Sequence, residues 1–444
     1  MVKNRIDKNY VNLLAKFISF KSVSTDSQFK SQIKDTVKWL GDLFLENNFA
    51  VKILTGKNSN PIVVAKYDNN SKETVLIYGH YDVQPAEFSH DWKTDPFILH
   101  KTDSKFYGRG VVDNKGQILI HMVTIFDLIK SGNLGFNIKF IIEGNEETAN
   151  PDMESILKEN SELLMSDFIL VSDGEILGDI PLIEASLRGG MNIKIKIRTN
   201  KNDLHSGTFG GAVLNAANVL IDLLAKMTNV KNEIFIDEFN GWKNKISKND
   251  TNATKILSTT RVRLLESLDN KTLTLSEDEN FFLKTGLLPT IQITGIKVGY
   301  TNEGFSNIIP CEAEANLNIR IINPQSSDEI DQIITKWVKE NINKNVDFTV
   351  DVFGKHNPVK LNIDSKIHNK ASICLEKAFG KKPMVKFVGG ALPFVTLVKE
   401  IFGKDALLIP LGNDDCNMHG PNENYSIKTI EKGLQFSREF FTRK

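Results

Sequence analysis

Short apolar runs alternate with amphipathic stretches along the first 185 residues of the chain. The apolar runs have the length of strands, whereas the amphipathic stretches repeat apolar residues at the three- and four-residue spacing of a helix. The predicted strands are residues 75–78, 138–142 and 168–171, and the predicted helices contain Val37, Leu40 and Phe44 or lie within residues 118–129. Buried strands that alternate with helices indicate a parallel or mostly parallel sheet with helices on both faces.

From about Ser186 the pattern changes to strict alternation of apolar and polar residues. Ile193, Ile195 and Ile197 alternate with polar side chains, as in a strand of a sheet with one exposed face. The elements predicted after this strand are a helix at residues 212–227, strands at 290–298, 313–321 and 346–352, and a helix between the last two strands. This order is typical of a split βαβ, ferredoxin-like α+β domain.

The helix between residues 321 and 346 carries the clearest signals. Ser326 and Glu329 have the spacing of a capping box at its start. One helical face then carries Ile330, Ile333, Ile334, Trp337 and Val338, so this helix is expected to cover the small sheet. Residues 229–288 are polar with scattered apolar positions, and we predict an insertion with helical pieces there.

After about Asn357 the first pattern returns, with a helical stretch at residues 367–379 and an apolar strand near Ile409. We therefore predict a discontinuous large domain, residues 1–185 and 357–444, into which a smaller domain, residues 186–356, is inserted. The expected fold class is α/β, with a mostly parallel sheet covered by helices and an inserted α+β domain.

Composition limits the classes of partner. The chain has 444 residues, of which 41% are apolar, enough to form two cores. Its 55 Lys and Arg residues balance its 55 Asp and Glu residues, which argues against the basic surface of a protein that binds nucleic acid or an anionic membrane. We expect a small-molecule partner, no nucleic acid and no membrane, because no apolar run approaches membrane-spanning length.

Cysteine usage and the N-terminal pattern bear on the compartment. The three scattered cysteines, Cys311, Cys374 and Cys416, suggest neither a disulfide framework nor a thiolate zinc site. The stretch from Leu13 to Phe20 is amphipathic rather than continuously apolar, so it does not resemble a signal peptide. Both observations favour a cytoplasmic protein.

Residues of metal-ligand type follow each predicted strand of the large domain. They are His80 and Asp82, Glu146 and Glu147, Asp173, and Asp414, Asp415 and His419, and a further candidate, Asp113, lies just before a helix. Ligands of open α/β sheets gather beyond the carboxyl ends of the strands, so these side chains are expected to converge. Imidazoles and carboxylates gathered at one sheet edge need cations to neutralise them, and mixed N/O ligation suits zinc, manganese or cobalt. We predict two divalent metal ions.

A site with two metal ions requires a division of labour among these residues. One carboxylate must bridge the ions, and we predict that Asp113 does so. Another carboxylate must accept a proton from a water molecule between the ions without being used as a ligand. The adjacent Glu146 and Glu147 point in different directions, so one is expected to be a ligand and the other a general base.

The ordered motifs resemble the M20 family of metallopeptidases, and most closely its carnosinase-like cytosolic dipeptidase branch. The resemblance covers residues 78–85, 108–116, 143–147, 172–175 and 205–207. It implies metal-dependent hydrolysis of the amide bond of a dipeptide or small peptide. It also implies that the inserted domain acts as a lid and dimerisation module.

The resemblance also implies a role for each site residue. His80 and Asp173 would bind one metal ion, Glu147 and His419 the other, and Asp113 both, with zinc expected first and manganese or cobalt as alternatives. Glu146 would be the general base and acid. Asp82 would hydrogen-bond the far nitrogen of His80 and fix its orientation.

Substrate contacts are implied more weakly. His205 would reach the active site of a neighbouring subunit in a homodimer and stabilise the oxyanion. Arg320 would bind the C-terminal carboxylate of the substrate. Asn307, Gly390 and Ala391 match further substrate-contact positions, but Asn307 stands where relatives often carry threonine and Ala391 where they often carry serine, which puts substrate preference in doubt.

Two other functions and one side chain stay open at this point. An N-acyl amino acid deacylase of the acetylornithine or succinyl-diaminopimelate type would use the same metals and base. A peptide-binding or scaffolding protein that kept the fold without catalysis would require a broken site, and every predicted ligand is present. Cys416 is close to the predicted metals, and we expect a small packed residue rather than a ligand.

Overall fold

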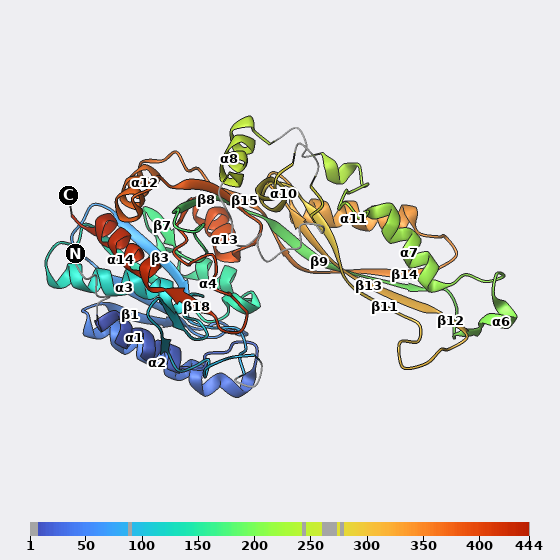
Figure 1. Cartoon of the computed structure of the whole chain (residues 1–444), viewed down its shortest axis with the longest axis horizontal. Coiled ribbons are helices and arrows are strands. Elements are labelled where there is room, and N and C mark those ends of the chain that lie inside the picture. The colour runs from blue at the N-terminus through green and yellow to red at the C-terminus, as the bar shows by residue number, and fades with distance from the viewer. Residues whose placement is uncertain (1–7, 88–90, 242–245, 260–272, 276–278, 444) are drawn as a thin grey trace.

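The computed structural model describes residues 8–87, 91–241, 246–259, 273–275 and 279–443. Over these residues the chain forms two lobes (Figure 1). The first described helix, α1 (Lys8–Ser19), and the last, α14 (Ile427–Phe441), both lie on the larger lobe. None of the described helices is long and apolar enough to cross a membrane.

The larger lobe is built on a nine-stranded sheet. Its order is β1 (Ala50–Leu54), β2 (Ile62–Tyr67), β6 (Asn137–Glu143), β3 (Thr74–His80), β7 (Phe168–Val171), β17 (Ala406–Leu408), β8 (Leu182–Leu187) and β15 (Val359–Lys360), and β16 (Met384–Val388) also pairs with β8. The central strands β6, β3, β7 and β17 are parallel to one another, as β16 is to β8, and the other pairs are antiparallel. The predicted α/β class is confirmed, with the antiparallel pairs towards the two margins.

Helices cover both faces of this sheet. Alternate residues of β3 face opposite sides, so Val75 and Ile77 lie in one core and Leu76 and Tyr78 in the other. The first core is closed by α1, α2 (Lys30–Glu46), α3 (Lys115–Lys130), α12 (Lys366–Phe379) and α14, and the second by α4 (Met153–Glu159), α5 (Ser161–Leu164) and α13 (Pro393–Phe402). Burial on both faces explains why these strands are continuously apolar in the sequence.

A small three-stranded sheet joins distant parts of the larger lobe. It consists of β4 (His100–Lys101), β5 (Lys105–Tyr107) and β18 (Asn424–Ser426), in the order β18-β5-β4. Pairing of Asn424 with Tyr107 brings the segment just before β18 beside the segment just after β5. One short 3-10 turn, η1 (Ser27–Phe29), precedes α2, and another, η2 (Glu146–Thr148), follows β6.

The smaller lobe contains a four-stranded antiparallel sheet with two helices on one face. The strands are β9 (Gly189–Arg198), β11 (Thr290–Val298), β13 (Glu312–Ile321) and β14 (Asp347–His356), in the order β11-β13-β9-β14. The helices α7 (Ala216–Met227) and α11 (Ser327–Asn341) pack on the buried side of β9, where Ile193, Ile195 and Ile197 lie. This is the predicted ferredoxin-like arrangement.

Two helix starts differ from the sequence prediction. α7 begins at Ala216 rather than at residue 212, because the side chain of Asn215 accepts a hydrogen bond from the Ala217 N–H and caps the helix there. The capping-box prediction for α11 is wrong, since the Ser326 side chain makes no cap hydrogen bond. Instead, the side chain of Asn357 accepts hydrogen bonds from the N–H and hydroxyl of Ser327, at 2.9 and 3.0 Å.

The helical pieces predicted within residues 229–288 are present where the structure describes this segment. They are η3 (Glu238–Asn240), α8 (Lys248–Ser258) and α10 (Phe281–Gly286). Although they follow α7 in the chain, α8 and α10 pack against β16 of the larger lobe. At the opposite end of the smaller lobe, β10 (Leu204–His205) pairs with β12 (Ile308–Ile309) beside the short helix α6 (Ser206–Phe209) (Figure 1).

The buried imidazole of His121 fastens α3 to its neighbours. Its Nδ1 lies 3.1 Å from the Ser437 hydroxyl of α14, and its Nε2 lies 2.9 Å from the Ser172 hydroxyl after β7. Burial lowers the pKa of His121 to about 3. The unfolded chain takes up a proton below pH about 6.5, whereas the folded state does not, so the stability linked to this group is lost as the pH falls from about 6.5 towards 3.

We expect His121→Gln to have a lower free energy of unfolding than the parent at pH 7.5. At pH 5.5 the difference between parent and variant should be smaller by about 1.4 kcal/mol. Acid lowers the unfolding free energy of the parent because the buried imidazole must stay neutral in the folded state. The variant lacks this imidazole and does not lose that stability. Urea unfolding of the metal-stripped parent and variant at both pH values measures the difference. An equal difference at the two pH values would contradict a neutral buried imidazole.

Candidate active site

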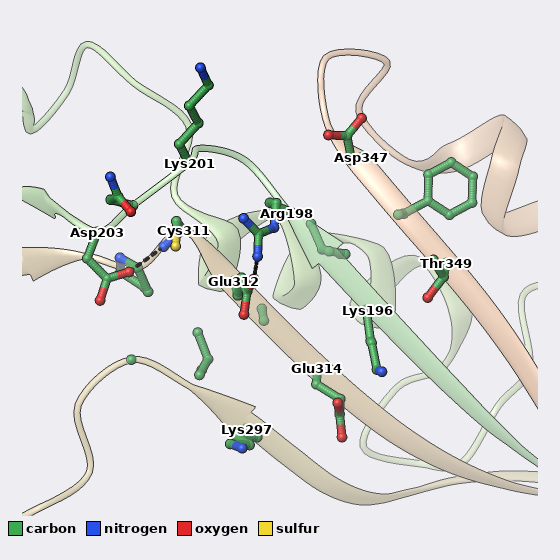
Figure 2. Close-up of a pocket in the computed structure, with 17 residues that line it drawn as sticks. Lys196, Arg198, Lys201, Asp203, Lys297, Cys311, Glu312, Glu314, Asp347 and Thr349 are labelled. Atoms are coloured by element: carbon green, nitrogen blue, oxygen red, sulfur yellow. Dashed lines mark hydrogen bonds and ion pairs between the residues drawn. The ribbon is translucent and has the colours of Figure 1, made fainter.

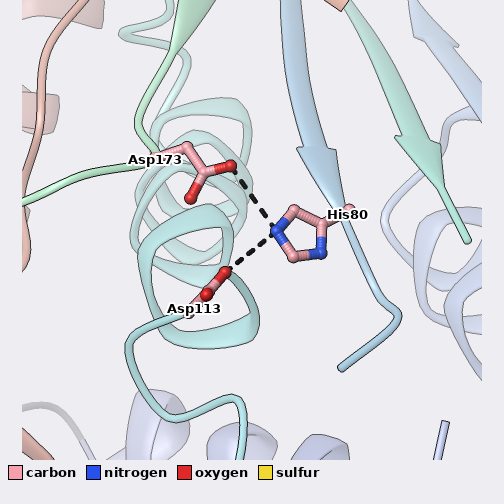
Figure 3. A group of neighbouring side chains, drawn as sticks. All are labelled: His80, Asp113 and Asp173. Atoms are coloured by element: carbon pink, nitrogen blue, oxygen red, sulfur yellow. Dashed lines mark ion pairs between the residues drawn. The ribbon is translucent and has the colours of Figure 1, made fainter. Parts of the chain in front are cut away.

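The predicted ligands lie together beyond the carboxyl ends of the central strands. His80 is the last residue of β3, Asp173 follows β7, and Asp113 lies just before α3. His80 Nε2 is 3.0 Å from Asp113 Oδ1 and 3.5 Å from Asp173 Oδ2 (Figure 3). Ligand atoms of these three side chains all lie within 4.8 Å of one another, close enough to share one metal ion.

A second group of ligand type shares Asp113 with the first. His419 Nε2 is 2.9 Å from Asp113 Oδ2 and 3.2 Å from Glu147 Oε2, and these three side chains also lie within 4.8 Å of one another. Glu147 is in η2, and His419 is on the loop after β17. The two oxygens of one carboxylate therefore face two separate imidazoles.

The orientation of His80 suits a metal ligand. Its Nδ1 lies 3.0 Å from the backbone carbonyl of Asp82 and 3.4 Å from the Asp82 carboxylate. Donation from Nδ1–H to either oxygen leaves a lone pair on Nε2, which is buried without a hydrogen bond and faces Asp113 and Asp173. The predicted contact between Asp82 and the far nitrogen of His80 therefore involves the Asp82 carbonyl as well as its carboxylate.

The Asp82 carboxylate has a second set of contacts that sequence reasoning missed. It accepts hydrogen bonds from the backbone N–H groups of Glu146 and Glu147, at 3.2 and 3.3 Å. The Gln84 side chain donates a hydrogen bond of 2.7 Å to Glu147 Oε2. The turn after β3 thus fixes the position of the glutamate pair after β6.

The electrostatics of this cluster favour cations. Burial opposes protonation of His80, but the carboxylates of Asp113 and Asp173 raise its pKa well above the usual value. Burial also raises the pKa of Glu146; His80 opposes this shift, whereas the charges of Asp173 and Asp113 add to it. Several carboxylates, the buried imidazole of His80 and the exposed imidazole of His419 match the donor set of two divalent cations with mixed N/O ligation.

Two predicted site residues lie far from these ligands in their own chain. His205, in β10, is exposed at the tip of the smaller lobe beside α6 (Figure 1). Its Nδ1 accepts a hydrogen bond of 3.1 Å from the Gly207 N–H, and the Asn307 carbonyl accepts one of 2.9 Å from the neighbouring Ser206 N–H. The structure therefore brings His205 and Asn307 close to each other but not to His80.

The other predicted substrate contacts lie where the two lobes meet. Arg320, near the end of β13, is half-buried and paired in register with Gly190, just after the chain enters β9 from β8. Gly390 and Ala391 are on the loop between β16 and α13, and the Gly390 carbonyl accepts a hydrogen bond of 3.2 Å from the Arg188 N–H.

Cys416 is buried in the core of the larger lobe, as predicted for a packed residue. Its thiol donates a hydrogen bond of 2.8 Å to the Glu175 carboxylate. Within the described part of the chain, neither of the two groups with metal-ligand geometry includes Cys416. The sequence carried no signal that Glu175 would be its partner.

A hollow of about 1010 Å³ lies on the smaller lobe, where β9 and β11 end and β13 begins (Figure 2). Three lysines and Arg198 line it together with carboxylates, and Arg198 forms an ion pair with Glu312. It contains none of the ligand residues or their neighbours in the larger lobe, so it does not mark the chemical site.

Comparison with known proteins identifies the family. The model of peptidase family M20/M25/M40 matches residues 76–443. The chain is 28% identical to the human Beta-Ala-His dipeptidase over 86% of this chain and 77% of that protein. It is 26% identical to the Cysteinylglycine-S-conjugate dipeptidase of Corynebacterium striatum, over 96% and 93% of the two chains.

A solved structure agrees in fold and family. The M20 family metallo-carboxypeptidase Sso-CP2 of Sulfolobus solfataricus superposes with a TM-score of 0.86 and 25% identity, over 98% of this chain and 99% of that one. The resemblance inferred from the sequence motifs is confirmed. Because the family model spans most of its length, this chain belongs to peptidase family M20/M25/M40 and is a metallopeptidase.

Proposed function

We propose that this protein is a dipeptidase that hydrolyses the peptide bond of dipeptides or small peptides with two divalent metal ions. One observation carries the proposal. One oxygen of Asp113 lies 3.0 Å from the His80 imidazole and the other lies 2.9 Å from the His419 imidazole, and a carboxylate that bridges two metal ions must direct its two oxygens in this way. The names of the human and Corynebacterium striatum relatives, both dipeptidases, support the substrate class.

In this proposal His80 and Asp173 hold one ion, Glu147 and His419 hold the other, and Asp113 contacts both. Zinc is the expected metal, with manganese or cobalt as alternatives. When bound, such ions polarise the scissile carbonyl and lower the pKa of the attacking water. Asp82 orients His80 from behind, through contacts of 3.0 and 3.4 Å to Nδ1.

Glu146 has the features of the general base. It belongs to neither ligand group, yet it is adjacent to Glu147 and held through its N–H by the Asp82 carboxylate. Its carboxylate would take a proton from the attacking water and deliver it to the departing amine nitrogen. Burial, which raises its pKa, suits a group that must be protonated during the reaction.

Arg320 is proposed to bind the C-terminal carboxylate of the substrate. We expect Arg320→Ala to raise KM for a dipeptide by about 10–100-fold, the loss of one charge-assisted contact. A dipeptide amide lacks this carboxylate, so the same substitution should leave its kcat/KM nearly unchanged. Equal losses for the dipeptide and its amide, measured by steady-state kinetics, would contradict carboxylate recognition.

We also propose a homodimer in which each subunit supplies His205 to the active site of the other. Support comes from the location of His205 and Asn307 at the exposed tip of the smaller lobe, far from the ligands of the same chain. An imidazole N–H directed at the developing oxyanion would stabilise the transition state.

Three further features belong to the same proposal. Residues 1–185 and 357–444 form the catalytic domain, and residues 186–356 form the lid and dimerisation domain. Gly390 and Ala391 contact the substrate from the loop before α13. The protein acts in the cytoplasm, consistent with the absence of a disulfide among its three cysteines.

Metal removal tests the function directly. We expect chelator-stripped protein to release no amino acids from a dipeptide panel and to recover turnover when Zn²⁺ or Mn²⁺ is restored, because Asp113 and its neighbours require cations. N-acyl amino acids, assayed in parallel, are the substrates of the alternative deacylase. Cleavage of these substrates alone would replace the dipeptidase proposal, and no turnover of either class with any metal would contradict both.

A further inference from the structure

Glu423 is a fully buried carboxylate that no part of the proposed chemistry uses. Its Oε2 accepts hydrogen bonds from the Gly110 N–H at 2.8 Å and from Arg109 Nη1 at 2.9 Å. Its Oε1 accepts from the N–H groups of Val112 and Asp113 at 2.9 and 3.2 Å. An ionised carboxylate is acceptor-only, so it is suited to four donors that converge in this way.

Arg109 carries the connection onward to another ligand segment. Its guanidinium is buried, and Nη2 donates to the backbone carbonyls of His419 and Gly420 at 3.1 and 3.3 Å. A third carbonyl, that of Pro85 in the segment after Asp82, lies 3.5 Å away. The Arg109–Glu423 pair therefore contacts the backbone of three segments that carry site residues.

The segment that bears His419 needs such a restraint. His419 has φ of 60°, in the left-handed region that residues other than glycine and asparagine rarely adopt, and Asn417, with φ of 53°, is in the same region. A residue held there costs of order 1–3 kcal/mol and persists only when its surroundings fix it. The two carbonyls that accept hydrogen bonds from Arg109 belong to His419 itself and to the next residue, Gly420.

We propose that Glu423 and Arg109 are positioning residues that hold Asp113 and His419 in the arrangement required for metal binding. Glu423 fixes the backbone of Asp113, whose two oxygens must meet His80 and His419. Arg109 fixes the backbone of His419. The inference rests on the metal-dependent function proposed above and extends it to a pair that touches neither substrate nor metal.

A positioning role for Glu423 and Arg109 predicts different results from a role in stability alone. In Glu423→Gln the amide NH₂ would confront N–H donors, so at least two of the four donors lose their acceptor. In Arg109→Lys the charge beside Glu423 remains, but the fork that reaches the His419 and Gly420 carbonyls is lost. The first change should loosen the Asp113 segment, and the second only the His419 segment.

Asn137 offers a matched control at the other end of the sheet. Its side chain also fastens a loop, accepting from the N–H groups of Asn69 and Ser71 at 2.9 and 3.0 Å. It begins β6, whereas the ligands follow the carboxyl ends of the strands. Asn137→Ala should lower the unfolding midpoint without changing the ligand segments.

The experiment measures deuterium uptake of chelator-stripped protein and, separately, affinity for two Zn²⁺ ions by competition with a chromophoric chelator. We expect Glu423→Gln to speed deuterium exchange in residues 108–114 and to lower the affinity for both zinc ions by about 10–100-fold. Arg109→Lys should speed deuterium exchange in residues 417–422 and lower the affinity for one zinc ion by a similar factor. Asn137→Ala should match the parent in zinc affinity and in the exchange of residues 108–114 and 417–422.

Parental exchange and parental affinity in Glu423→Gln would overturn the inference. If Glu423→Gln does not fold, Arg109→Lys decides, and parental affinity for both ions in that variant would overturn it. Equal loss of zinc affinity in Asn137→Ala would also overturn it, because the effect would then be general destabilisation. A parent that binds no zinc would instead defeat the proposed function, and the exchange data alone would then decide the role of the pair.

Discussion

Glu146→Gln is expected to lower kcat for dipeptide hydrolysis by about 10²–10⁴-fold, the usual contribution of a general base and acid. The amide cannot accept a proton from water or return it to the leaving amine. Neither predicted ligand group contains Glu146, so the variant should still bind two metal ions. Steady-state kinetics with a good dipeptide, combined with metal titration of the same preparation, measures both quantities.

Glu154→Gln provides the matched control for this substitution. Glu154 is an exposed residue of α4 whose carboxylate pairs with Lys158 one turn away. The same chemical change at this position should leave kcat within a factor of about two, because exposed pairs of this kind contribute little. Turnover by Glu146→Gln at more than about a tenth of the parental rate would assign the base to another group.

His205→Ala is expected to lower kcat by about 10²–10³-fold, the loss of one donor to an oxyanion, although His205 directly precedes α6, which lies at the tip of the smaller lobe. In the proposed homodimer, this loss would arise in the site of the other subunit. Mixing this variant with Glu146→Gln should therefore restore activity, because one site of each mixed dimer would contain both an intact Glu146 and the His205 of its partner.

The recovered activity has a defined size. Random exchange of subunits at equal amounts gives mixed dimers half of the time, each with one complete site, so about a quarter of the parental activity should return. Each variant mixed with the parent supplies the control for subunit exchange. No recovery in a mixture shown to exchange subunits would mean that His205 acts within its own chain or not at all.

The fold was largely predictable because its pattern depends on local burial. Strands buried on both faces, such as β3, are continuously apolar, and the alternation in β9 reflects a sheet with one covered face. Four of the five predicted metal ligands could be located by the same argument, since His80, Glu147, Asp173 and His419 come after the central strands β3, β6, β7 and β17, which are parallel to one another. Their convergence in space required only the rule that parallel strands end at one edge.

Features that depend on contacts between distant segments could not be predicted. The start of α11 is fixed by Asn357, which lies thirty residues after Ser327. Glu423 reaches Gly110 across 313 positions, and its only sequence signal was its closeness to His419. Nothing in the sequence of residues 248–258 indicated that α8 would pack on β16. Periodicity describes which face of an element is buried and does not identify the partner.

The smaller lobe is elongated, so a small rotation at its junction with the larger lobe would move its far end by a large distance. β9 runs from the junction between the lobes towards the end that carries α6, β14 runs back to the junction, and the ten residues of β9 span about 34 Å. A rotation of about 10° at the junction would therefore displace the far end by about 6 Å, more than the length of a hydrogen bond.

The backbone at the junction between the lobes is tightly packed around Gly189. A side chain added at Gly189 would lie 2.4 Å from the Pro358 nitrogen and 2.5 Å from the His356 carbonyl oxygen, where the chain leaves and re-enters the larger lobe. A methyl group at Gly189 cannot be accommodated unless the backbone there shifts, so a substitution that touches no metal ligand would change the geometry at the base of the ten-residue strand β9.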